Sequence, residues 1–134
     1  MLKQISIYAE NRMGTFQRIT ELLFKEDINI LGSVTNDSAE YGIIRMVVSD
    51  TEKALAALTK AGYMCKQTEV LGIEVKDEAG NLNKLLLAMK ESNINADYLY
   101  LSFNRDSAMP IMVVHTPDIY EVEECLRGKG FVAL

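Results

Sequence analysis

Hydrophobic and polar positions along the chain alternate in two rhythms, one typical of strands and one typical of helices. Residues 3–8 alternate with a period of two, whereas Phe16, Ile19 and Leu23 follow the spacing of one helix face. Runs rich in β-branched residues, bounded by turn-like segments, indicate further strands. In the first half these patterns predict a strand over residues 3–8, a helix over 14–26, strands over 28–35 and 42–49, a helix over 51–61 and a strand over 63–67.

The second half of the chain repeats this order. A shift of 66 positions places Gly14 on Gly80 and Asn29 on Asn95, and the apolar helix faces coincide as well. The repeat predicts a strand over residues 71–76, a helix over 82–92, strands over 94–102 and 110–115, a helix over 118–127 and a strand over 131–134.

The order strand, helix, strand, strand, helix, strand is that of a ferredoxin-like unit, with both helices on one face of the sheet. We therefore expect two domains, residues 1–69 and 70–134, joined near residues 68–71. A unit of this size is marginal alone, and pairing of edge strands would remove two exposed edges. The expected fold is α+β, with two ferredoxin-like βαββαβ repeats side by side in an eight-stranded antiparallel sheet and helices on one face.

Composition and charge narrow the class of protein. The chain is 49% hydrophobic and 25% charged, which suits a packed core, and its net charge of −5 argues against nucleic acid or an anionic membrane as a partner. No run of about 18 apolar residues and no signal-peptide pattern occurs. Cys65 and Cys125 form no C-x-x-C pair, so we expect reduced, structural thiols and a cytoplasmic protein.

The stretch "YAENRMGTFQRI" joins the first predicted strand to the first predicted helix. The backbone N–H groups of Met13, Gly14 and Thr15 would lie at the helix N-terminus, where anions bind. Asn11 offers both a donor and an acceptor, which an α-amino acid requires, while Arg12 either adds charge or points to solvent. A plain turn, with Asn11 as a helix cap and Gly14 as a turn residue, explains the same spacing.

At these residues the chain resembles a known family. "ENRMGTF", followed by "INILGSV" around Asn29, is similar to the signature of the ACT domain, the amino-acid-sensing module attached to many biosynthetic enzymes. The loop is especially similar to that of the serine-sensing domain of phosphoglycerate dehydrogenase. The resemblance covers the whole chain as two tandem copies and implies a stand-alone regulatory protein.

The resemblance also implies where a ligand binds. In the family, a loop asparagine and an asparagine at the start of the second strand hold the amino acid across a pair of domains. Here Asn11 would face Asn95, and Asp77 would face Asn29, at the interface between the two repeats. The expected ligand-binding residues are Asn11, Arg12, Met13, Gly14, Thr15, Asn29, Ile30, Leu31, Asp77, Ala79, Gly80, Asn81, Asn95 and Ala96.

Departures from the family pattern limit this inference. Ala9 and Val75 stand where the serine-sensing relative carries a histidine, so serine is not implied. The second loop, "DEAGNL", keeps Gly80 but carries Asp77 and Glu78. Two carboxylates repel a ligand carboxylate unless they hold its ammonium group, so the first pocket is expected to bind better.

The remaining reactive side chains indicate no chemistry. His115 is the only histidine and has no cluster of metal-ligating residues around it, so we expect a structural or surface role. Neither cysteine has a recognisable base. Tyr98 and Tyr100 share one strand face, where they either line a ligand pocket or pack in the sheet. No catalytic residue, metal or cofactor is expected.

The sequence therefore favours a regulatory protein, not an enzyme, with a free amino acid as effector; a metabolic enzyme is a candidate partner. A homo-oligomer is expected. One alternative is a structural or regulatory subunit that binds no ligand. Another is a small acylphosphatase-like hydrolase using Arg12, although that family's glycine-rich loop is absent. An RNA-recognition module is disfavoured because the central strands lack its aromatic motif.

Overall fold

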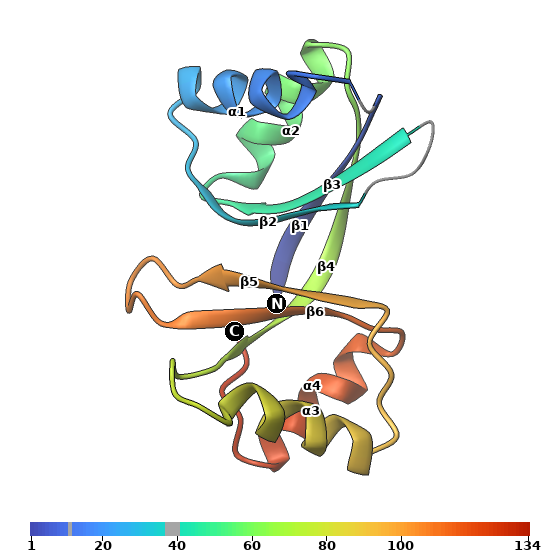
Figure 1. The fold of residues 1–134 in the computed structure, drawn as a ribbon, viewed down its shortest axis with the longest axis vertical. Coiled ribbons are helices and arrows are strands. Elements are labelled where there is room, and N and C mark those ends of the chain that lie inside the picture. The colour runs from blue at the N-terminus through green and yellow to red at the C-terminus, as the bar shows by residue number, and fades with distance from the viewer. Residues whose placement is uncertain (11, 37–40) are drawn as a thin grey trace. The chain divides into compact units, whose positions relative to one another are not determined.

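The computed structural model describes residues 1–10, 12–36 and 41–134 and contains two compact units. One unit consists of residues Lys3–Thr68, and the other of Met1–Leu2 together with Glu69–Leu134. Figure 1 labels the elements of both units. Within the described residues each unit carries two helices, as the repeat predicts.

The first unit has the ferredoxin-like order of elements. Its elements are β1 (Leu2–Glu10), α1 (Thr15–Lys25), β2 (Ile30–Asn36), β3 (Tyr41–Val48), α2 (Thr51–Lys60) and the start of β4 (Met64–Glu74). The strands follow the hydrogen-bonding order β2-β3-β1-β4, and β3 runs antiparallel to both β1 and β2.

Both helices of this unit cover the same sheet face. Alternate residues of β1 and β3 point into one apolar cluster, and α1 and α2 each contribute two buried side chains to it. The fully or nearly fully buried members are Ile5, Ile7, Ala9, Ile19, Leu23, Ile28, Ile44, Met46, Val48, Ala54 and Leu58. Burial of this apolar surface is the main stabilising term of the unit.

The second unit repeats the arrangement. It contains the rest of β4, followed by α3 (Asn81–Glu91), β5 (Tyr98–Phe103), β6 (Pro110–His115) and α4 (Ile119–Gly128). The order is β4-β6-β5, with antiparallel pairs. Its core consists of Leu71, Ile73, Leu85, Ala88, Met89, Met112, Val114, Val122 and Leu126.

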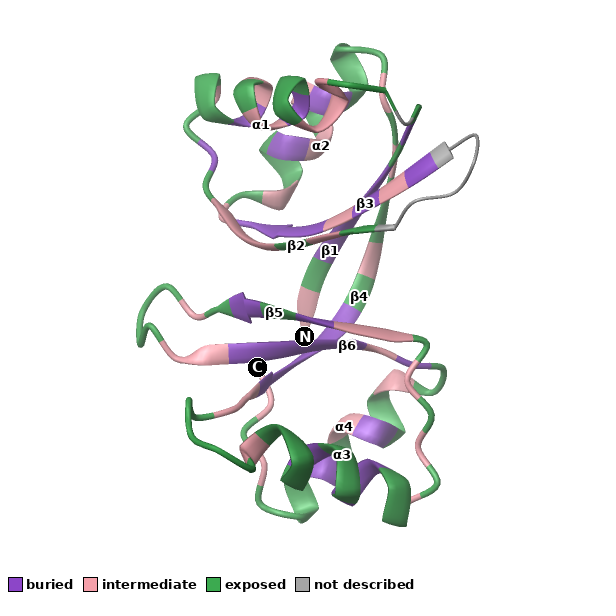
Figure 2. Cartoon of the chain, viewed as in Figure 1, coloured by how far each residue is buried: buried purple, intermediate pink, exposed green. Residues whose placement is uncertain are grey.

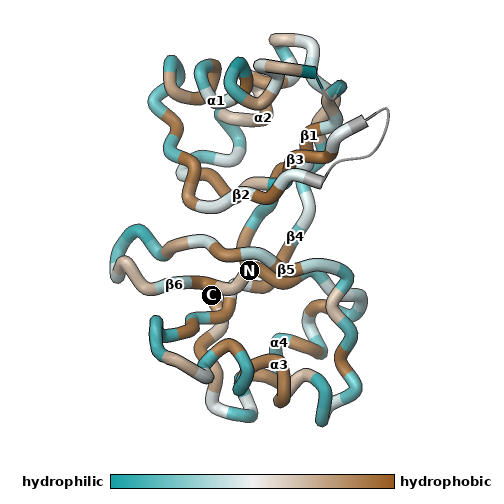
Figure 3. Tube along the Cα trace, viewed as in Figure 1, coloured by the Kyte–Doolittle hydropathy of each residue, from teal (hydrophilic) through white to brown (hydrophobic). Residues whose placement is uncertain are grey.

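The middle of β6 is buried on both faces. Four successive residues of this strand are buried, a pattern typical of a strand without a solvent face. In Figure 2, β6 is largely purple, whereas green alternates with purple or pink along α3 and α4. Figure 3 shows the trace of β6 in brown over much of its length, as its apolar sequence requires.

The expected eight-stranded sheet is wrong, because the described residues form six strands. The two strands predicted over residues 63–67 and 71–76 are one continuous strand, β4, and the expected connection between them lies inside it. Gly72 of this strand permits close approach of Leu2 rather than a turn. The last predicted strand is reduced to a single bridge between Ile73 and Ala133.

The other predicted elements agree with the structure, with one exception at a boundary. β5 begins at Tyr98, although its apolar pattern predicts a start at Ile94. The residues between them form a connection in which the Asp97 N–H donates to the His115 carbonyl at 2.9 Å. The apolar side chains of Ile94 and Ala96 in this connection pack on the core, which explains why their alternation in the sequence resembles that of a strand.

α1 and α3 begin in the same unusual way. Gly14 and Gly80 are the N-cap residues, with φ of 82° and 90°. Neither provides a side-chain cap, in contrast to Asp50, whose Oδ1 accepts the Lys53 N–H at 3.1 Å at the start of α2. The left-handed region favours glycine because a Cβ is strained there.

We predict that Gly80→Ala lowers the free energy of unfolding by about 1 kcal/mol through strain at positive φ. Gly128→Ala is the matched control, because a Cβ meets nothing within 4 Å at either position but Gly128 has no positive φ. The control should be neutral or stabilising by up to about 1 kcal/mol. Urea unfolding of both variants measures the difference, and equal midpoints would contradict the strain.

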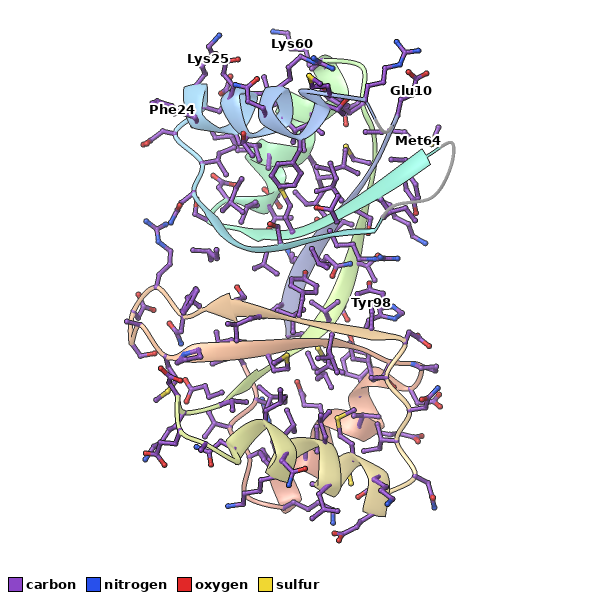
Figure 4. All side chains as sticks on the ribbon, in the orientation of Figure 1. Glu10, Phe24, Lys25, Lys60, Met64 and Tyr98 are labelled. Atoms are coloured by element: carbon purple, nitrogen blue, oxygen red, sulfur yellow. The ribbon has the colours of Figure 1, made fainter. Side chains whose placement is uncertain are left out.

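Two neighbouring residues of α1 test the core. Leu23 is fully buried, whereas Phe24 is 77% exposed and lies at the C-terminal end of the helix (Figure 4). Leu23→Ala should cost about 2–5 kcal/mol through lost burial and a residual cavity, and Phe24→Ala less than about 0.5 kcal/mol. Thermal unfolding checks both values; a comparable loss in the two variants would show that the helix face is assigned wrongly.

Candidate functional site

The described residues between β1 and α1, residues 12–14, include a turn with Arg12 and Met13 exposed. Asn11, the first predicted ligand residue, lies outside the described residues. Arg12 Nε lies 2.7 Å from Glu10 Oε2, with both side chains more than half exposed. The Arg12 N–H donates to the Glu10 carbonyl at 2.9 Å. The guanidinium therefore has an acidic partner within its own loop, although an exposed pair of this kind is weak and open to exchange.

One of the three backbone donors predicted at the start of α1 is bonded within the loop. The Thr15 N–H donates to the Arg12 carbonyl at 3.2 Å, and the first helical bond joins the Arg18 N–H to the Gly14 carbonyl at 2.9 Å. The first N–H groups of a helix have no partner within the helix. Met13 is 99% exposed, so its side chain does not cover this helix end.

The loop between β4 and α3 has the same plan. The Lys84 N–H donates to the Gly80 carbonyl at 2.9 Å, matching the Arg18 bond in the first repeat. Asp77 and Ala79 are exposed. Asn81 Nδ2 donates to the Lys76 carbonyl at 3.1 Å and so closes the loop; its role as a ligand residue stays a prediction.

The two predicted asparagines at the strand starts are held by their backbones. The Asn29 N–H donates to Ser49 Oγ at 2.9 Å, and its carbonyl accepts the Ser49 N–H at 2.9 Å. The Asn95 carbonyl accepts Thr116 Oγ1–H at 3.0 Å. Both residues are exposed, and within the described ranges neither side-chain amide has a hydrogen-bond partner. Each amide is therefore available to a ligand from a fixed backbone.

Two of the predicted residues beside these asparagines pack against the cores of their units. The β2–β3 register shifts between Ile30 and Gly32, so Leu31 lies at an irregularity of the strand. Ile30 packs against the core of the first unit, and Ala96 against that of the second. Of these predicted site residues, Ile30 and Ala96 thus have a packing role.

In the second repeat, Asp77 lies before α3 and Asn95 lies after it. This helix of 11 residues spans about 16 Å at about 1.5 Å per residue, so the two residues lie far apart within the repeat. The expected combinations, Asn11 with Asn95 and Asp77 with Asn29, draw one residue from each repeat. They stay predictions.

Cavities in the second unit include several predicted residues. Asn95 lines one of about 410 Å³ together with Thr116, Asp118 and Glu121. Asn81 lines a second, of about 380 Å³, and Asp77 lines a third, of about 280 Å³. Apolar side chains dominate the third cavity, which sequence reasoning did not anticipate.

The sequence patterns also did not predict a cluster of side chains around His115. His115 Nδ1 lies 2.9 Å from Asp97 Oδ2, and the imidazole stacks on Tyr98 with ring centroids 4.9 Å apart and planes within 6°. Tyr98 and His115 are direct cross-strand partners. Knowledge of the residue pairing between β5 and β6 would have predicted that these three residues lie close together.

The described residues provide little for metal or thiol chemistry. No group of three or more His, Cys, Asp or Glu side chains within them is placed to hold a metal ion. Burial raises the pKa of the Cys65 thiol, so less of the nucleophilic thiolate is present at neutral pH. None of the described helices is long and apolar enough to cross a membrane.

Two solved structures share the fold at low identity. The ligand-free regulatory subunit of aspartate kinase from Thermus thermophilus is 16% identical, with a TM-score of 0.67 over 94% of this chain and 89% of that chain. The regulatory subunit of aspartate kinase from Thermus flavus is 19% identical, with a TM-score of 0.63 over 95% and 90%. No curated protein sequence gives a significant match.

A nearer relationship identifies the family. The structure of protein BT0572 from Bacteroides thetaiotaomicron is 31% identical, with a TM-score of 0.88 over 99% of this chain and 91% of that chain. Residues 1–128 match the family described as ACT domain pair. The matched segment contains both loop glycines and both strand asparagines. The chain therefore belongs to the ACT domain pair family.

Proposed function

We propose that this ACT domain pair is a regulatory protein that binds a free amino acid and carries out no reaction. The observation that carries the proposal is the recurrence of one polar arrangement in both repeats. A glycine in the left-handed conformation is the N-cap residue of α1 and of α3. After each helix comes an asparagine, Asn29 or Asn95, whose backbone is hydrogen-bonded and whose side-chain amide is exposed. Membership of the ACT family supports the same function.

The arrangement suits the two charged groups of an amino acid. The helices that follow Gly14 and Gly80 present N–H groups without a partner inside the helix and the positive end of the helix dipole, and both features favour a carboxylate. The amide of Asn29 or Asn95 both donates and accepts, so it matches either group of the ligand. Asp77 adds a site for the ammonium.

The structure gives an enzymatic function little support. Arg12, the residue that a phosphate-binding hydrolase would need, pairs with Glu10. The loop of the second repeat has no arginine, and the Cys65 thiol is disfavoured as a nucleophile. A regulatory role needs only differential affinity of the ligand for two states of the protein.

We further propose that the output is control of a metabolic enzyme by a homo-oligomer of this chain in the cytoplasm. The Thermus proteins that share its fold are regulatory subunits of aspartate kinase, which makes an enzyme partner a natural hypothesis. Both cysteines are free thiols, in keeping with a reducing compartment.

A second candidate is a regulatory subunit that binds no ligand. Two contacts favour it: the Arg12–Glu10 pair and the bond from Asn81 to the Lys76 carbonyl, which satisfy polar groups of the loops without any ligand. The two candidates differ in whether any amino acid stabilises the native protein.

We predict that a screen of the twenty amino acids by thermal shift gives one or two that raise the melting temperature, because a ligand that binds only the native state stabilises it. Asn95→Ala should then weaken binding in calorimetry by about 1–3 kcal/mol, since it leaves a polar partner unpaired. Gln67→Ala, which removes another exposed amide, is the control and should bind as wild type does.

Each contrary outcome has a defined meaning. The absence of any stabilising amino acid at millimolar concentrations would refute the sensor and favour the ligand-free subunit. Unchanged affinity in Asn95→Ala would remove this residue from the site. A loss in Asn29→Ala alone would favour the predicted combination of Asp77 with Asn29 over that of Asn11 with Asn95.

A further inference from the structure

The cavity beside Asp77 is an apolar groove with a charged end. It has a volume of about 280 Å³ and lies where the β4–α3 loop meets the turn between β5 and β6, two segments that share one side of this unit in Figure 1. Its lining, called the groove below, consists of Val75, Lys76, Asp77, Glu78, Leu82, Leu101, Phe103, Pro110 and Met112.

The groove exposes large apolar side chains from two different elements. Leu82 of α3 is 40% exposed, and Leu101 and Phe103 of β5 are 49% and 51% exposed. The last two belong to the same strand face as Leu99, which packs on the core, so the groove continues the core surface beyond the helix. An occupant that removed these side chains from water would be stabilised by the hydrophobic effect.

Charges of both signs stand at the end of the groove. Lys76, Asp77 and Glu78 are successive exposed residues, and none of their side chains forms an ion pair or hydrogen bond within the part of the chain that the structure describes. An apolar cavity with ammonium and carboxylate groups at one end complements a molecule with an apolar body and a zwitterionic head. A free amino acid with a large apolar side chain has this chemistry.

We propose that the groove holds the side chain of an aliphatic or aromatic amino acid, with the ligand ammonium at Asp77 and Glu78 and its carboxylate at Lys76. The proposal rests on the amino-acid-binding function above and specifies the class of ligand. A cavity of about 280 Å³ lies just below the range of about 300–1,000 Å³ that is usual for drug-sized ligands, so a single amino acid is a suitable occupant.

The first repeat carries different residues at the positions that correspond to the groove. Thr35 occupies the position that corresponds to Leu101, and the position that corresponds to Phe103 is Asp37, which lies outside the described residues. Phe16 replaces Leu82 and packs partly buried against its own core. The groove thus favours the second repeat as the binding site, contrary to the expectation from loop charge alone, because Lys76 offsets the two carboxylates.

Calorimetry of the full chain with single amino acids tests the proposal. L-leucine, L-methionine and L-phenylalanine should include ligands at least tenfold tighter than L-serine, L-threonine and L-lysine. Leu101→Thr introduces the residue of the first repeat on an exposed strand position and should weaken binding of the apolar ligand about 3- to 20-fold through lost apolar contact. Val132→Thr is the matched control, since Val132 is 53% exposed but lines the neighbouring cavity.

The outcomes separate this inference from the function it rests on. Binding of polar amino acids only, or equal affinity in Leu101→Thr and wild type, would overturn the groove but leave the sensor intact. Failure of every amino acid to bind would overturn both. If sedimentation shows that Leu101→Thr splits an oligomer without altering ligand affinity, the groove is a contact between copies of the chain and the proposal is wrong.

Discussion

The strand β4 is the element on which both repeats depend. Its 11 residues supply the last strand of the first unit and the first strand of the second, without a turn between them. Val70, Leu71 and Ile73 are fully buried, so the second half of the strand cannot shift without losing core contacts. At its end the Val75 N–H donates to the Pro110 carbonyl at 3.0 Å. The core of the sheet thereby fixes the start of the second loop beside the β5–β6 turn.

The candidate site follows from this placement. The strands β1 and β4 end where the loops begin. A left-handed glycine then precedes α1 and α3, so that N–H groups without a partner inside the helix face the loop. The strand asparagines are likewise held through their backbones, which leaves their side chains free. Polar groups positioned by a scaffold that does not need them for stability are suited to binding, because little ordering is required when the ligand arrives.

Much of this architecture could be predicted from the sequence, for identifiable reasons. The apolar residues of the helix faces, such as Phe16, Ile19 and Leu23, follow the helical period closely. Because the chain repeats, the patterns of both halves predict the same order of elements. The continuity of β4 was missed because its first half is largely exposed and polar, like a connecting segment. The contact of Asp97 with His115 was missed because it depends on cross-strand register, which apolar periodicity does not specify.

The groove was missed for a different reason. Leu101 and Phe103 alternate correctly for a core-facing strand, yet both side chains are about half exposed in the structure. Coverage of one element by another is a property of three-dimensional packing. Sequence patterns indicate which face a side chain occupies, but not whether another element reaches it.

The central claim is that an amino acid binds at one or both of the loops that end at Gly14 and Gly80, directly before α1 and α3. The most direct measurement is a titration of the ¹⁵N-labelled protein with free amino acids, following every backbone amide by NMR. The account predicts saturable shifts concentrated in residues 76–82, residues 93–97 or the corresponding segments of the first repeat. Amides that do not move at millimolar amino acid, or shifts confined to the outer faces of α2 and α4, would contradict it.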